Sequence, residues 1–127
     1  MRKIVFLIVA IAIVLVISST AQAASKTINH TKKMVKQVHH LVPPAIMAKW
    51  RLVNICEEGG RWDIRGPIYS GGLGITNVNW AAYGGQRLFG PAWKATPEQQ
   101  VYIAIRIQRL NGAGDFVPDQ NGCGQGW

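Results

Sequence analysis

The sequence predicts one small exported domain of the α+β class that is mainly helical, with a short β- or turn-rich segment and one disulfide. The chain has 127 residues, and four of its segments show helical patterning of apolar residues. A segment rich in glycine and proline separates the second helical segment from the third. The chain also has two cysteines and an apolar N-terminal segment, which indicate export and a disulfide. We expect a monomer.

Residues 1–23 have the pattern of a secretory signal peptide. Two basic residues precede an uninterrupted apolar run over residues 4–17, and a small-x-small cleavage motif, Ala21-Gln22-Ala23, follows it. The run is shorter than the roughly 20 apolar residues that a transmembrane helix needs. We therefore expect cleavage and secretion; the alternative is an uncleaved membrane anchor over residues 4–24.

The charge balance favours anionic partners outside the cell. Removal of residues 1–23 takes away Arg2 and Lys3, so the net charge falls from +8 to +6 over the 104 residues that remain. Such a charge suits teichoic acids, acidic glycans or phospholipid headgroups. Nucleic acid is not expected, because the cations are scattered and the protein is exported. A membrane is expected as a partner only through an uncleaved N-terminal segment.

Residues 24–45 should form a basic N-terminal helix or spacer. Apolar residues recur with helical spacing over residues 27–42, and Pro43-Pro44 ends the pattern. His39 and His40 are consecutive, so their rings point about 100° apart on a helix and cannot share a metal ion well. We interpret them as solvated.

Residues 46–127 should form the domain itself. A helix over residues 44–58 has proline in its first turn and stops at Gly59-Gly60, and turns or a small hairpin follow. A short helix should start at Thr76 or Asn77 and end at Gly84-Gly85, with a loop over residues 88–95. The clearest start is Thr96-Pro97-Glu98-Gln99, which opens an apolar helix through Leu110 that should be the buried central helix. The tail should be a coil.

Glu57 is the candidate catalytic acid. Ile46, Trp50 and Val53 form an apolar stripe along the helix, and one further step along it lands on Glu57. Glu58 instead continues the polar stripe. A carboxylate at the end of an apolar stripe loses hydration, so its pKa rises, as a general acid near neutral pH requires. A surface charge pair is the alternative.

Aromatic and amide side chains close to Glu57 in the sequence suggest a site for sugar rings. Aromatic faces stack on sugar rings, and nearby polar groups hydrogen-bond the hydroxyls. The candidate substrate-binding residues of this kind are Trp62, Asp63, Tyr69, Asn79 and Trp80. Burial in the core is the alternative for Trp62 and Trp80, whereas Tyr69 should be exposed.

Four stretches, "CEEGGRW", "YSGGLGI", "NWAAYGG" and "ATPEQQ", resemble in order and spacing the resuscitation-promoting factor domain, a secreted actinobacterial type of lysozyme-like transglycosylase. The resemblance covers roughly residues 46–123. It implies a lysozyme-like fold with Glu57 as the catalytic acid. We expect no cofactor, and no metal site, because the two cysteines lie far apart in the sequence and no histidine is near either. Export already favours a disulfide between Cys56 and Cys123, and the resemblance implies the same pairing.

The substrate that the resemblance implies is the glycan strand of peptidoglycan, cut at the β-1,4 bond between N-acetylmuramic acid and N-acetylglucosamine. Tyr69, Gly71 and Gly72 match the family's Tyr-x-Gly-Gly element, past which the polymer runs. The chain departs from the family at Gly74, where glutamine is usual, and at Asn79, where threonine is frequent. A catalytically weak or inactive basic glycan-binding protein of the cell wall is therefore the alternative function, and an antimicrobial or signalling protein is a third.

Overall fold

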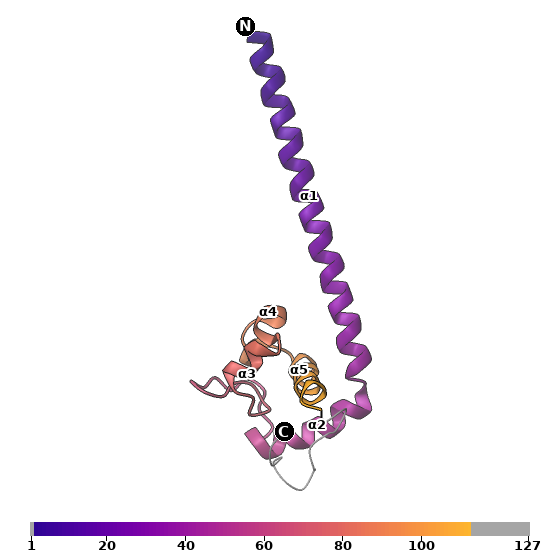
Figure 1. The fold of residues 1–127 in the computed structure, drawn as a ribbon, viewed down its shortest axis with the longest axis vertical. Helices are drawn as coiled ribbons and strands as arrows, with labels where there is room; N and C mark the ends of the chain where they lie inside the picture. The colour runs from indigo at the N-terminus through magenta and orange to yellow at the C-terminus, as the bar shows by residue number, and fades with distance from the viewer. Residues whose placement is uncertain (1, 113–127) are drawn as a thin grey trace. The chain divides into compact units, whose positions relative to one another are not determined.

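The computed structural model describes the backbone of residues 2–112 and the side chains of residues 20–112. The described chain is mainly helical, as expected (Figure 1). Its elements in chain order are α1 (Arg2–Leu41), α2 (Pro44–Glu58), α3 (Asn77–Ala82), α4 (Gly85–Phe89), the 3₁₀ helix η1 (Ala92–Lys94) and α5 (Pro97–Leu110).

The chain divides into two compact units, residues 1–37 and residues 38–127. The helix expected over residues 27–42 is the last part of α1, which ends at Leu41, just before the proline pair. His39 and His40 are exposed, as predicted. No helix in the described part of the chain is long and apolar enough to cross a membrane. The side chains of the apolar run over residues 4–17 lie outside the described ones.

Helix α2 begins and ends where its sequence predicts. Pro43 is the N-cap residue in an extended conformation, and Pro44 opens the helix. Gly59 ends it with φ +62°, and the amides of Gly59 and Gly60 donate to the carbonyls of Ile55 and Asn54. This left-handed conformation favours glycine, and it places Glu57 and Glu58 in the last turn.

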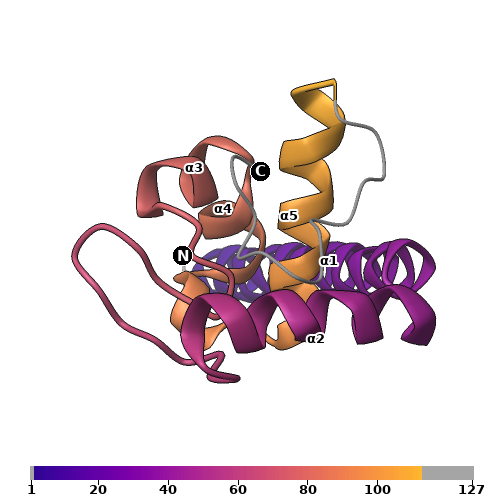
Figure 2. The ribbon, with the colours of Figure 1, turned by 90° about the horizontal axis from the view of Figure 1, so that it is seen from below.

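The segment between α2 and α3 forms turns, so the β part of the α+β expectation needs correction. The described residues contain two isolated antiparallel bridges, Arg65 to Ser70 and Tyr69 to Thr76, and no strand. Gly71 and Gly74 have positive φ values of 84° and 64°, which interrupt an extended ladder at both places. The segment extends away from α2 and returns to α3 (Figure 2).

Helix α5 is the buried central helix that the sequence predicts. Val101, Ile103 and Ala104 are fully buried, and α5 contacts both α2 and α4 (Figure 2). Its start is a capping box: the Thr96 side chain accepts from the Gln99 amide, and the Gln99 side chain accepts from the Thr96 amide. Trp50 of α2 and Trp80 of α3 supply the largest buried side chains of the core.

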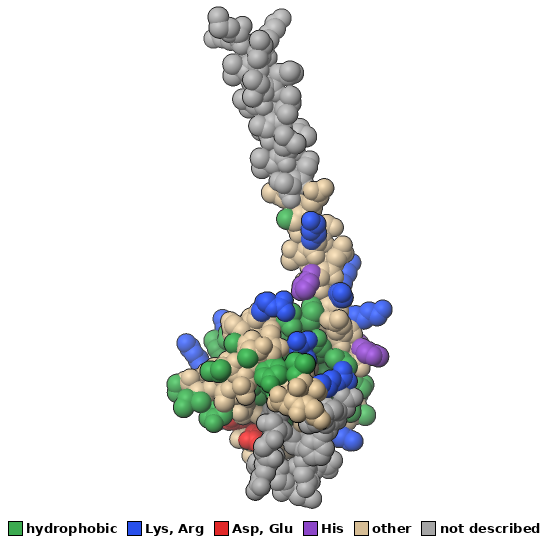
Figure 3. Space-filling model, in the orientation of Figure 1, with side chains coloured by type: hydrophobic (Ala, Val, Ile, Leu, Met, Phe, Trp, Pro, Cys, Tyr) green, Lys and Arg blue, Asp and Glu red, His purple; other side chains and the backbone are tan. Residues whose placement is uncertain are grey.

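Helices α4 and η1 stand where the sequence predicts a helix stop and a loop. Gly85 is the first residue of α4. The Trp80 indole packs directly on it, and a Cβ at this position would overlap the ring, so the position requires glycine. On the face shown in Figure 3, Lys and Arg side chains are spread over the described surface and acidic side chains are few. Residues 113–127, and with them the predicted partner Cys123, lie outside the described residues.

Candidate active site

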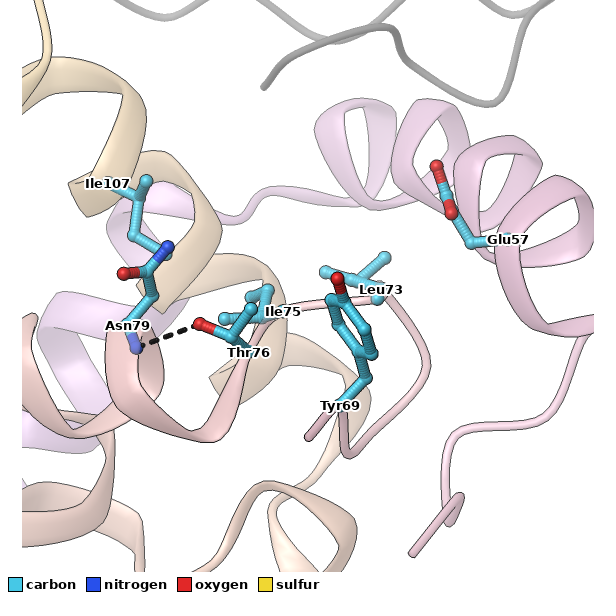
Figure 4. A pocket seen from close by; sticks show the side chains of 8 residues that line it. Glu57, Tyr69, Leu73, Ile75, Thr76, Asn79 and Ile107 are labelled. Atoms are coloured by element: carbon cyan, nitrogen blue, oxygen red, sulfur yellow. Dashed lines mark hydrogen bonds between the residues drawn. The ribbon is translucent and has the colours of Figure 1, made fainter. Parts of the chain in front are cut away.

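A pocket of about 230 Å³ opens beside the last turn of α2 (Figure 4). The turn-rich segment supplies most of its wall, and α3 and α5 close it on the side away from Glu57. Tyr69 lies between Glu57 and Asn79 in this view. The lining residues are Glu57, Tyr69, Leu73, Gly74, Ile75, Thr76, Asn79 and Ile107.

Glu57 is the carboxylate of this pocket. Burial raises the pKa of its carboxyl, and the negative charge of Glu58 raises it further. The apolar stripe of α2 predicts the burial of Glu57. The effect of Glu58 depends on how close the two carboxyl groups lie. Glu58 is half-buried as well, but it is not among the lining residues. A carboxyl that stays protonated above its ordinary pH range can donate a proton to a leaving group.

Gly74 lies against the Glu57 carboxyl. A Cβ built on Gly74 would lie 3.2 Å from Glu57 Oε2 and 3.7 Å from its Cδ, and the φ of Gly74 is +64°. Both the conformation and the space therefore favour glycine at this position. The residue at which the sequence departs from the family pattern is thus part of the pocket wall.

Tyr69 and Asn79 are the other predicted site residues that the pocket contains. Tyr69 is 51 % exposed, as its place in a glycine-flanked turn predicts. The Asn79 side chain is also exposed, and its backbone amide donates to Thr76 Oγ1 at 3.1 Å, the cap of α3. The N-cap hydrogen bond of α3 therefore fixes the backbone position of Asn79. Ile107, from the central helix, was not predicted as a site residue.

The remaining predicted site residues do not line this pocket. Trp80 is buried, and its indole Nε1 donates to the Gly90 carbonyl at 2.8 Å, which supports the alternative of a core residue. Trp62 is half-buried, Asp63 is exposed, and Gly71 and Gly72 are buried. These two glycines belong to the support of the pocket wall.

Two buried amides hold that wall in place, and the sequence analysis missed both. Gln100 of α5 accepts from the Gly72 amide through Oε1 at 2.7 Å. Its Nε2 donates to three carbonyl oxygens, those of Trp62, Ala92 and Ala95.

The second buried amide, Asn54 of α2, holds Gly72 from the other side. Its Nδ2 donates to the carbonyls of Gly72 and Arg61, both at 2.7 Å. Asn54 is 2 % exposed, so the polar stripe expected to face solvent carries a buried residue instead. For Gln100 the available signal was a glutamine inside an otherwise apolar helix, whereas the polar stripe of α2 gave no such signal for Asn54.

No group of three or more His, Cys, Asp or Glu side chains within the described part of the chain is arranged to hold a metal ion.

Residues 44–118, more than half of the chain, match the family described as "Transglycosylase-like domain". The chain belongs to the transglycosylase-like domain family. Three relatives are similar to this transglycosylase-like chain, all of them resuscitation-promoting factors. Rpf1 of Corynebacterium glutamicum is 44 % identical over 66 residues, which cover 51 % of this chain and 34 % of Rpf1.

Two relatives from Mycobacterium tuberculosis cover slightly more of this transglycosylase-like chain. RpfA is 38 % identical over 79 residues, 61 % of this chain and 18 % of RpfA. RpfD is 35 % identical over 78 residues, 61 % of this chain and 48 % of RpfD. The matched region thus spans less than half the length of each relative. The resemblance noted in the sequence is thereby confirmed.

Proposed function

We propose that the protein is a peptidoglycan-cleaving lytic transglycosylase, with Glu57 as its general acid and base. The proposed substrate is the β-1,4 bond between N-acetylmuramic acid and N-acetylglucosamine. The observation that carries this proposal is the position of Glu57: its carboxyl lines the pocket, and its pKa is raised by burial. Membership of the transglycosylase-like family supports the same class of reaction.

The reaction requires one proton donor that later becomes a base. The protonated Glu57 carboxyl gives its proton to the glycosidic oxygen, and the bond between that oxygen and C1 of the muramyl unit breaks. The Glu57 carboxylate then takes the proton of the muramyl 6-hydroxyl as O6 bonds to C1. The products are a 1,6-anhydromuramyl end and a free 4-hydroxyl on N-acetylglucosamine, and no water is consumed.

The lining residues favour this route over hydrolysis by two carboxylates. Most glycosidases place two carboxyl groups on either side of the scissile bond. Glu57 is the one carboxylate among the described residues that line the pocket, since Asp63 and Glu58 lie outside it. A hydrolytic reaction would need a polar side chain such as Asn79 to hold the attacking water. Tyr69 and Asn79 are the proposed contacts to the sugar rings, because both are exposed at the pocket.

The test is the chemistry of the products. Purified peptidoglycan is incubated with the protein, and the soluble muropeptides are weighed by mass spectrometry. Transglycosylation gives anhydro ends, which are lighter by one water than the reducing ends of hydrolysis. Release of reducing ends alone would replace the transglycosylase by a hydrolase, and no release would end the enzyme proposal.

A basic glycan-binding protein without catalytic activity is the second candidate, favoured by the net charge of +6 that remains after removal of residues 1–23. It binds peptidoglycan through cations, so added salt weakens the binding. It releases no fragments, and Glu57→Gln leaves its binding unchanged.

We further propose that residues 1–23 are a signal peptide, residues 24–45 a basic helix or spacer, and residues 46–127 the catalytic domain. The protein would then be secreted and associated with the cell wall as a monomer. A disulfide between Cys56 and Cys123 would tether the last turn of α2, next to Glu57, to the tail.

A further inference from the structure

A second cavity, of about 200 Å³, lies on the other side of the turn-rich segment. Neighbouring residues of this segment divide between the two cavities: Tyr69 and Thr76 line the Glu57 pocket, whereas Ser70 and Asn77 line the second one. We name the second cavity the Arg65–Trp93 pocket after two of its lining residues. Its wall also includes Trp80 and Gln86.

Two cations lie against the Trp93 ring of this pocket. The Arg65 guanidinium carbon is 5.2 Å from the ring centroid, and the Lys94 ammonium nitrogen is 4.8 Å from it. Neither cation forms an ion pair in the part of the chain that the structure describes. A guanidinium close to an aromatic ring is attracted by a cation–π interaction, and its planar set of N–H donors suits bidentate binding of a carboxylate or phosphate.

Two amide side chains, those of Asn77 and Gln86, are among the residues that line the pocket. Asn77 Nδ2 donates to the carbonyls of Gly66 and Pro67, both at 3.1 Å, so the orientation of its amide is fixed. Asn77 Oδ1 has no partner among the described residues, and Gln86 adds an exposed amide. The Trp80 indole Nε1 is bonded to Gly90 and its ring is buried, so the half-buried Trp93 supplies the exposed aromatic surface of this pocket.

We propose that the Arg65–Trp93 pocket binds a sugar unit that carries an oxyanion, in an acidic polysaccharide outside the cell. Aromatic surface and amides are groups that contact a sugar ring. Arg65 is the cation among the lining residues; a neutral sugar does not need it, whereas a carboxylate or phosphate would pair with it directly. The pocket shares no lining residue with the Glu57 pocket, and the inference rests on the proposed function only for the presence of cell-wall polysaccharide.

Isothermal titration calorimetry with three oligosaccharide probes of matched length tests this inference. The probes are a uronic-acid oligosaccharide, a glycosylated glycerol-phosphate oligomer and a neutral N-acetylglucosamine oligosaccharide. We expect at least one acidic probe to bind roughly tenfold more tightly than the neutral probe, the effect of one hydrogen-bonded contact to a charged group. Which acidic probe binds identifies the source of the oxyanion. Equal binding of all three probes would overturn the proposal.

Variants separate the pocket from general charge. Arg65→Gln should weaken binding of the acidic probe roughly tenfold by the same reasoning, and Trp93→Leu should weaken it as well. Arg51→Gln removes the same charge from an exposed position on α2 that lines neither pocket, and it should change affinity less than about twofold. Near-UV circular dichroism checks that each variant is folded.

Equal losses in Arg65→Gln and Arg51→Gln would overturn the proposal, because they would show attraction by net charge alone. The result is independent of the catalytic proposal: if Glu57→Gln retained full muropeptide release, the transglycosylase would be wrong and the comparison of Arg65 with Arg51 would still stand.

Discussion

Gln100 and Gln108 offer a matched pair of substitutions on the same helix. Both lie on α5, and both side chains are buried, 1 % and 2 % exposed. Gln100 accepts one hydrogen bond through Oε1, and its two Nε2 N–H groups donate to three backbone carbonyls around the wall of the Glu57 pocket. Neither polar atom of the Gln108 side chain has a hydrogen-bond partner among the described residues. Methionine keeps the length and approximate volume of glutamine and removes its hydrogen bonds. The pair therefore isolates the value of the bonds.

We expect Gln100→Met to lower the free energy of unfolding by about 3 kcal/mol, from about 1 kcal/mol for the bond from the Gly72 amide and for each of the two Nε2 N–H groups. The buried Gly72 amide would also lose its acceptor, which adds to the cost. Such a loss is large beside the roughly 5–15 kcal/mol that stabilises a small domain. We expect Gln108→Met to be neutral or stabilising, because it replaces an unbonded polar group by an apolar one.

Urea unfolding monitored by tryptophan fluorescence measures both variants. The urea concentrations at the midpoints are compared. If the dependence of the unfolding free energy on urea (the m value) is the same in each variant, a shifted midpoint reports a change in stability. Similar losses in the two variants would refute the reasoning, since they would show that packing at α5, and not the bonds of Gln100, supports the wall.

Three further predictions concern the pocket and its tether. Gly74→Ala should cost about 1–2 kcal/mol of stability for its left-handed backbone and should also reduce muropeptide release, because its Cβ would press on the Glu57 carboxyl. Gly112→Ala also replaces a glycine of positive φ, +81°, with open space around it, so it should carry backbone strain without the loss of activity. The rate of release should fall as pH rises through the raised pKa of Glu57, because the proton donor is lost. The free energy of unfolding should fall over the same range, because the folded state holds the Glu57 proton more tightly than the unfolded state does. A limb of the pH profile at the ordinary pKa of glutamate would contradict this. Intact mass with and without reductant should differ by two protons for a disulfide between the two cysteines, and two freely alkylated thiols in the native protein would refute it.

Local signals in the sequence predicted the helices well. The capping box at Thr96 and Gln99 and the stop at Gly59 depend on residues within one turn, so they could be identified without tertiary contacts. The apolar stripe of α2 likewise singled out Glu57, because helical periodicity decides which of two neighbouring carboxyls turns toward the core.

The support of the pocket could not be predicted in the same way. Gln100 reaches Gly72 and Trp62 across 28 and 38 residues of sequence, and no local pattern states such a pairing. Trp80 illustrates the same limit, since stacking on a sugar and burial against Gly85 demand the same residue type. Helix α4 was missed because the pair Gly84-Gly85 predicts the end of a helix. Gly85 is instead the first residue of α4, and it is glycine because a Cβ there would overlap the Trp80 indole.

The central claim is that Glu57 is the proton donor, and the rate of muropeptide release by Glu57→Gln and Glu58→Gln tests it most directly. Glutamine keeps the size and hydrogen bonding of the side chain but has no transferable proton. We predict that Glu57→Gln lowers the rate by about 10²–10⁴-fold, the usual cost of a lost general acid, while Glu58→Gln retains most of the rate. Equal rates in the wild type and Glu57→Gln, or a greater loss in Glu58→Gln, would contradict the account.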